Sequence, residues 1–150
     1  MKSALSALSF AIAAAVVSGS AHASLLWRWS CQGHGFHASG TFTTEDKPNA
    51  DGFYEIAAVA GEADGFAIVA LEKVGTSIPG NPGYPVDNLV RAKRPHLTKN
   101  GFGFALANKT YANPFYGAHF AKPDYYSFIS DPANGRTSEP VVTFTAALAR

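Results

Sequence analysis

Cysteine is nearly absent from this sequence, whose 150 residues include only Cys31. A single thiol cannot form an internal disulfide, so the packing of the chain must hold the fold together. Cysteine is among the residues most often buried in folded proteins, and we therefore expect Cys31 to lie in the core. No arrangement of this cysteine with a histidine can be read from the sequence, and nothing in it indicates a catalytic thiol.

An excess of charge of either sign is also missing. The chain has 12 Lys and Arg against 11 Asp and Glu, and removal of an N-terminal segment containing Lys2 would leave 11 of each. No basic patch suggests a nucleic-acid partner, and no acidic tail suggests a basic one. The composition therefore excludes nucleic-acid binding from our expectations.

A long hydrophobic run occurs only at the N-terminus. Lys2 is followed by the almost unbroken apolar run 4–17, and Ala21-His22-Ala23 forms a small-residue cleavage site. These are the parts of a secretory signal, and the run is too short for a bilayer, which needs roughly 20 residues. We expect residues 1–23 to be a signal peptide and residues 24–150 to be a single domain, secreted or periplasmic, with no membrane span after cleavage.

Helical periodicity is missing from the rest of the chain. Its short segments are either apolar or have apolar and polar residues in alternation, and glycine- and proline-rich turns separate them. Such spacing is typical of an all-β antiparallel sandwich or small barrel, here with about eight short strands. The stretch 108–124 is aromatic and irregular, and 131–140 is a loop by composition. The expected strands are 25–31, 36–44, 53–59, 66–71, 89–92, 102–106, 125–130 and 141–148.

The first expected strand carries two tryptophans. Trp27 and Trp29 are two residues apart and therefore point to the same face of a strand, with Arg28 on the other. Leu25 shares their face, which favours a core position over an exposed platform for ligand. We predict that both indoles are buried.

Several segments spread along the chain form a recognisable set: Ala38-Ser39-Gly40-Thr41-Phe42-Thr43-Thr44, the run 49–56, Ile78-Pro79-Gly80-Asn81, the run 86–91 and Tyr111-Ala112-Asn113-Pro114-Phe115. In these segments the chain resembles a family of short secreted bacterial proteins that often carry a PEP-CTERM sorting tail. The resemblance implies export and association with the envelope or matrix, but no known activity. The last residues, 146–150, lack the Pro-Glu-Pro motif, apolar helix and basic end of such a tail, so sorting by that route is not expected.

Catalytic signatures are lacking as well. The chain has no G-x-S-x-G elbow of a serine hydrolase. With 11 acidic residues some pair of carboxylates is inevitable, so a pair alone does not indicate a glycosidase. We expect no cofactor and more readily a binding domain than an enzyme. The alternative is a small secreted hydrolase whose site is assembled only in three dimensions.

Two oxygen-rich segments are weak calcium candidates. Asp87 and Asn88 end a long Gly/Pro loop just before an expected strand, and Glu45, Asp46, Asn49 and Asp51 share another loop. Calcium takes six to eight oxygen ligands, whereas the same residue types also stabilise loops through local hydrogen bonds. We favour the second explanation and expect no metal site.

Aromatic residues are the most informative excess. In a small domain most of them must form the core, but one group falls in loop-rich sequence, where a tyrosine can present its ring to a ligand. Sugar rings stack on such faces, so extracellular polysaccharide or envelope components are the expected partners. The alternative is a satellite core beneath a long loop. The candidate residues are Tyr111, Phe115, Tyr116, Tyr125 and Tyr126.

Overall fold

The computed structural model describes residues 23–150, so the predicted signal peptide lies, apart from Ala23, outside the described residues. The described part is built of antiparallel strands and one 3-10 turn, η1, at Pro132–Asn134. The strands are Ser24–Gly33 (β1), Phe36–Glu45 (β2), Tyr54–Ala63 (β3), Phe66–Leu71 (β4), Leu89–Val90 (β5), Phe104–Leu106 (β6), Tyr111–Tyr116 (β7), Tyr125–Asp131 (β8), Arg136–Ser138 (β9) and Val141–Leu148 (β10).

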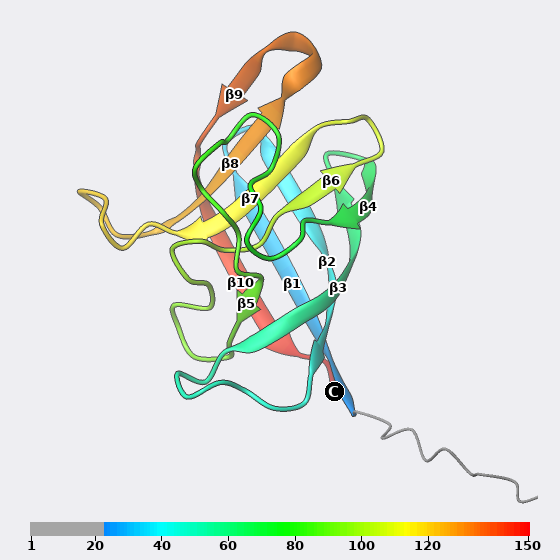
Figure 1. The fold of residues 1–150 in the computed structure, drawn as a ribbon, viewed down its shortest axis with the longest axis vertical. Helices are drawn as coiled ribbons and strands as arrows, with labels where there is room; N and C mark the ends of the chain where they lie inside the picture. The colour runs from blue at the N-terminus through cyan, green and yellow to red at the C-terminus, as the bar shows by residue number, and fades with distance from the viewer. Residues whose placement is uncertain (1–22) are drawn as a thin grey trace, which may run out of the picture.

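Eight of these strands close into a barrel (Figure 1). The order is β10-β1-β2-β3-β4-β6-β7-β8, and β8 returns to β10 through the pairs Tyr126–Val141 and Tyr125–Val142. The two short strands β5 and β9 pair with β3 and β8 outside this circuit. The prediction of an all-β sandwich or small barrel is confirmed in its barrel form. No helix described within residues 23–150 has the length and apolarity needed to cross a membrane.

The sequence prediction was wrong in two places. The stretch read as irregular contains β7, which pairs with β8 over its whole length although Pro114 lies within it. Tyr116 donates its backbone N–H to the carbonyl of Thr98, away from β8. Residues two apart on a strand direct their backbone groups to the same edge, so the nitrogen of Pro114 also faces away from β8. On that edge the pairing with β6 has already ended, so the missing N–H of proline removes no bond between strands. The second error is β9, an exposed edge strand read as loop.

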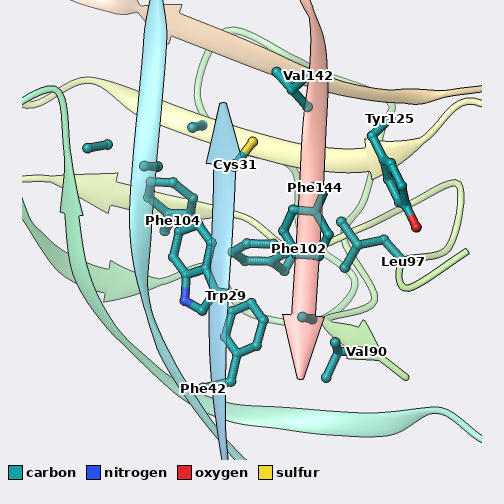
Figure 2. Close-up of a cluster of buried hydrophobic side chains, with 14 of the residues drawn as sticks. Trp29, Cys31, Phe42, Val90, Leu97, Phe102, Phe104, Tyr125, Val142 and Phe144 are labelled. Carbon is teal, nitrogen blue, oxygen red and sulfur yellow. The ribbon is translucent and has the colours of Figure 1, made fainter. Parts of the chain in front are cut away.

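Aromatic side chains fill the barrel interior (Figure 2). Trp27 and Trp29 are 0% and 3% exposed, which confirms the prediction made from their spacing. The indole N–H of Trp27 donates to the hydroxyl of Thr44 at 3.0 Å. Around Trp29 gather the rings of Phe42 on β2, Phe104 on β6 and Phe144 on β10, together with Phe102 from the segment just before β6. These rings therefore pack against one another in the barrel interior.

Cys31 is buried in this core, as predicted. Burial raises the pKa of its thiol from 9.0 to about 12, because the interior disfavours the thiolate. We expect native protein to resist iodoacetamide at pH 8 and to react fully in 6 M guanidinium. Unfolded protein releases this proton above pH 9 and the native protein does not, so stability should fall as the pH rises from 9 towards 12. Alkylation of native protein at the unfolded rate would contradict the prediction.

The segment between β4 and β5 covers the outer face of β6, β7 and β8 (Figure 1). Ile78 and Val86 are buried, and a Cβ placed on Gly103 would meet both side chains at 2.8 and 3.1 Å. The absence of a side chain at Gly103 thus lets the segment pack directly on the barrel wall. Two backbone bonds close it into a compact loop, from Val86 N–H to Thr76 O and from Gly75 N–H to Val86 O, each at 2.9 Å.

Candidate functional site

A groove of about 630 Å³ lies on the outer face of the barrel, where the loop between β4 and β5 meets the connection between β7 and β8. The β4–β5 loop contributes Asn81, Gly83, Tyr84 and Pro85 to its lining, and the β7–β8 connection contributes residues 117–120. Ligand pockets are typically about 300–1,000 Å³, so the groove has room for a few sugar units or a similar small ligand. Its other lining residues are Lys99, Asn100, Asn113, Phe115, Phe128 and Glu139.

Three rings hold the β7–β8 connection against the barrel. Phe120 lies 4.5 Å from Tyr126 and 5.9 Å from Phe115, and Phe115 stacks on Tyr126 at 6.0 Å, all between ring centroids. Gly117 passes so close that a Cβ would lie 2.9 Å from the Tyr126 ring. The hydroxyl of Tyr126 donates to the carbonyl of Lys122 at 2.9 Å. These contacts fix one wall of the groove and leave Phe120 39% exposed.

From the β4–β5 loop, Tyr84 lines the groove and is 69% exposed. Asn113 of β7 also lines it and is 3% exposed. Its amide nitrogen donates to the carbonyls of Asn100 and Phe102, each at 3.0 Å, and these bonds fix the orientation of the amide. The groove thus combines exposed aromatic faces with a rigidly held polar side chain, which is the usual composition of a small-ligand site.

One carboxylate, Glu139, is among the residues that line the groove. Partial burial raises the pKa of Glu139. A general acid with a raised pKa is half of what glycoside hydrolysis requires, because most glycosidases use a pair of carboxyl groups that flank the bond. The second carboxyl group of such a pair is not among the residues that line the groove.

The structure separates the aromatic residues predicted as a binding group. Phe115 lines the groove, and Tyr126 supports it from behind. Tyr125 is 1% exposed inside the barrel, where its hydroxyl accepts the N–H of His96 at 2.7 Å, so its proposed role as an exposed binding ring is wrong. Tyr116 packs on Tyr125 at 5.3 Å against the core. Tyr111 begins β7, is half-buried and does not line the groove.

Sequence reasoning missed Tyr84, Phe128 and Glu139 as site residues, and it noted Phe120 only as part of the irregular stretch. Tyr84 stands between Gly83 and Pro85, in a segment that cannot be helix or central strand. An aromatic residue in such a loop is either exposed or anchors the loop, and this alternative was the only sign in the sequence that Tyr84 could belong to a site. Phe128 lies two residues after Tyr126 on the same strand, so the two side chains point to the same face, and Phe128 could have been predicted as a site residue together with Tyr126.

Asp87 and Asn88 serve the scaffold beside the groove. The Asp87 carboxylate accepts the Thr98 hydroxyl at 2.6 Å and the Leu89 N–H at 3.3 Å. Burial raises the pKa of Asp87, while these hydrogen bonds act in the opposite direction. Asn88, at a φ of 53°, donates its amide to the carbonyl of Glu72 at 2.7 Å. Both candidates are thus engaged in local hydrogen bonds.

The second oxygen-rich loop is likewise held by local bonds, since Asn49 Oδ1 accepts the N–H groups of Asp51 and Phe53, each at 3.0 Å. Across residues 23–150, no three His, Cys, Asp or Glu side chains come together as a metal-holding group. Comparison with known proteins adds no assignment: no family model, no curated protein and no solved structure matches the chain.

Proposed function

We propose that this protein is an exported, non-catalytic domain that binds polysaccharide of the bacterial envelope or extracellular matrix in the groove beside β7. The observation that carries the proposal is the pair of exposed rings, Tyr84 and Phe120, which line one groove together with Asn113, a polar side chain held by hydrogen bonds. A sugar presents an apolar C–H face and a rim of hydroxyls. Aromatic rings can pack on the first, and exposed polar side chains of the lining such as Lys99 and His119 can bond the second.

Export is the part of the proposal that comes from the sequence. The mature protein is expected to begin at Ser24, which is also the first residue of β1. Because cleavage there would leave the described strands intact, the exported domain should fold as described. Intact-mass measurement on protein recovered from the periplasm or medium checks this. Material that still carries residues 1–23 would contradict it.

Loss of a groove ring should weaken polysaccharide binding without affecting the fold. Tyr84→Ala removes a ring that is 69% exposed, so the melting temperature should stay within a degree or two. An aromatic contact contributes about 0.5–1.5 kcal/mol, so affinity should fall about 2- to 13-fold. Phe120→Ala should have at least the same effect on binding, with some loss of stability because that ring also holds the wall.

The measurement is affinity electrophoresis and calorimetry against a panel of neutral and acidic polysaccharides. The matched control is Phe66→Ala, which removes a ring that is 44% exposed on β4 and does not line the groove. It should leave binding unchanged. Equal losses for Phe66→Ala and Tyr84→Ala, or no binding to any polymer of the panel, would overturn the proposed function.

A further inference from the structure

Asparagine is followed by glycine at two places in the chain, Asn100-Gly101 and Asn134-Gly135. Asparagine is one of the chemically labile residues of proteins. In this dipeptide the backbone nitrogen of glycine can attack the side-chain carbonyl carbon of asparagine, because glycine has no Cβ to hinder the approach. The attack requires the peptide between the two residues to rotate, and the structure holds the two sites very differently.

The fold locks the first of these sites. Gly101 is buried, and a Cβ on it would lie 1.8 Å from the carbonyl oxygen of Pro114. Its N–H donates to the hydroxyl of Thr98 at 3.1 Å. The carbonyl of Asn100 accepts the side-chain amide of Asn113 at 3.0 Å. Rotation of this peptide would break both bonds and press on β7, so we expect this site to be protected.

The second site lies at the surface, in the connection between β8 and β9 (Figure 1). The 3-10 turn η1, which ends at Asn134, contains no buried residue, and Gly135 after it is exposed. Nothing lies within 4 Å of a Cβ on Gly135. Its N–H bonds to the carbonyl of Pro132 at 3.3 Å, beyond the usual range of about 2.7–3.2 Å. Because few contacts hold this turn, its local opening should require little free energy.

We propose that Asn134 is a site of spontaneous deamidation, with water as the only co-reactant. The nitrogen of Gly135 gives up its proton to hydroxide and bonds to Cγ of Asn134. The bond from Cγ to Nδ2 breaks, and the nitrogen leaves as ammonia after taking a proton from water. Water then opens the resulting succinimide ring at one of its two carbonyls, which yields aspartate or isoaspartate. The reaction involves no oxidation or reduction, and the inference is independent of the proposed function.

The product is expected to loosen β9. In the unmodified protein Nδ2 of Asn134 donates to the carboxylate of Asp131 at 2.7 Å. A carboxylate at position 134 has no proton to donate and repels Asp131. Isoaspartate also adds one carbon to the backbone just before the pair Asp131–Arg136, where β8 and β9 meet. Because β9 lies outside the closed circuit of strands, the barrel itself should stay intact.

The test is incubation of the purified protein at 37 °C and pH 8, followed by peptide mapping with mass spectrometry that distinguishes aspartate from isoaspartate. Asn134 should react at least about 10-fold faster than Asn100, because only the second site needs a costly local opening. Asn108 is an internal control for the glycine, since it is exposed but is followed by Lys109, and it should stay intact. In 6 M guanidinium Asn100 should react as fast as Asn134. Equal rates at Asn100 and Asn134 in the native protein, or an Asn134 that stays intact, would overturn the inference.

The effect on β9 is tested with Asn134→Asp, which reproduces the charge of the product. Hydrogen exchange of the β9 backbone amides should become faster in this variant, while exchange in β1 and β2 and the melting temperature stay near the wild-type values. The matched control is Asn108→Asp, which adds the same charge to an exposed turn elsewhere and should leave β9 unchanged. Unchanged exchange of β9 in Asn134→Asp and in the deamidated wild type would overturn the predicted loosening.

Discussion

Replacement of Trp29 by alanine is expected to lower the free energy of unfolding by about 3–5 kcal/mol. The indole stacks on Phe42 at 5.2 Å with an interplanar angle of 6°, and meets Phe102 edge-on at 5.3 Å. It also lies opposite Gly40 on β2. A Cβ on Gly40 would lie 1.9 Å from the carbonyl of Ala60, so this position must stay without a side chain.

No neighbour can fill the space that the indole leaves. Position 40, opposite it on β2, must remain glycine, and the surrounding rings are fixed by other contacts. The variant therefore keeps a large cavity in the centre of the barrel. A domain of this size has about 5–15 kcal/mol of stability in total, so the variant should be marginal or unfolded at 37 °C. Urea denaturation followed by the fluorescence of the remaining Trp27 measures the loss.

Trp29→Phe is the matched control. It keeps a ring in the stack and removes the indole N–H, which is buried with no hydrogen-bond partner among the described residues. Loss of an unsatisfied donor offsets part of the lost packing, so this variant should be within about 2 kcal/mol of wild type. A fully stable Trp29→Ala protein would show that the core does not depend on this indole.

Strand alternation and turn composition were enough to predict most of the barrel strands and the two central tryptophans. They could not choose between a sandwich and a barrel, because closure depends on the pairs that Tyr125 and Tyr126 make with Val142 and Val141. That contact has no local signal in the sequence. Pro114 hid β7, since a proline within a run argues against a central strand unless the lost N–H faces an unpaired edge.

The candidate site was predicted only in part, and the same period of two explains why. Tyr125 and Tyr126 are adjacent on β8, so one faces the core and the other the outside, as do Tyr116 and Phe115 on β7. Loop residues such as Tyr84 carry no periodicity from which direction can be derived.

Gly101→Ala should be among the most damaging single changes outside the core and should also impair the groove. Gly101 has a φ of 61°, and a Cβ there would lie 1.8 Å from the carbonyl of Pro114 and 2.8 Å from the Cβ of Phe115. Its carbonyl accepts the N–H groups of Asp87 and Asn88 at 3.2 and 2.9 Å. Alanine must therefore displace β7, together with the Phe115 ring that lines the groove, or break the attachment of the loop between β4 and β5.

The left-handed backbone costs a non-glycine residue about 1–2 kcal/mol, and forced overpacking adds about 1–3 kcal/mol, so we expect a loss of about 2–5 kcal/mol in unfolding free energy. Gly75→Ala separates the two causes, because Gly75 has a φ of 82° and nothing within 4 Å of a Cβ. It should lose only the backbone part and keep wild-type polysaccharide affinity. Gly101→Ala, measured below its melting temperature, should bind more weakly than Tyr84→Ala, since β7 carries both Phe115 and Asn113 of the groove. Equal stability losses for the two glycine variants, with binding intact in both, would show that β7 tolerates the shift and that the groove does not depend on its position.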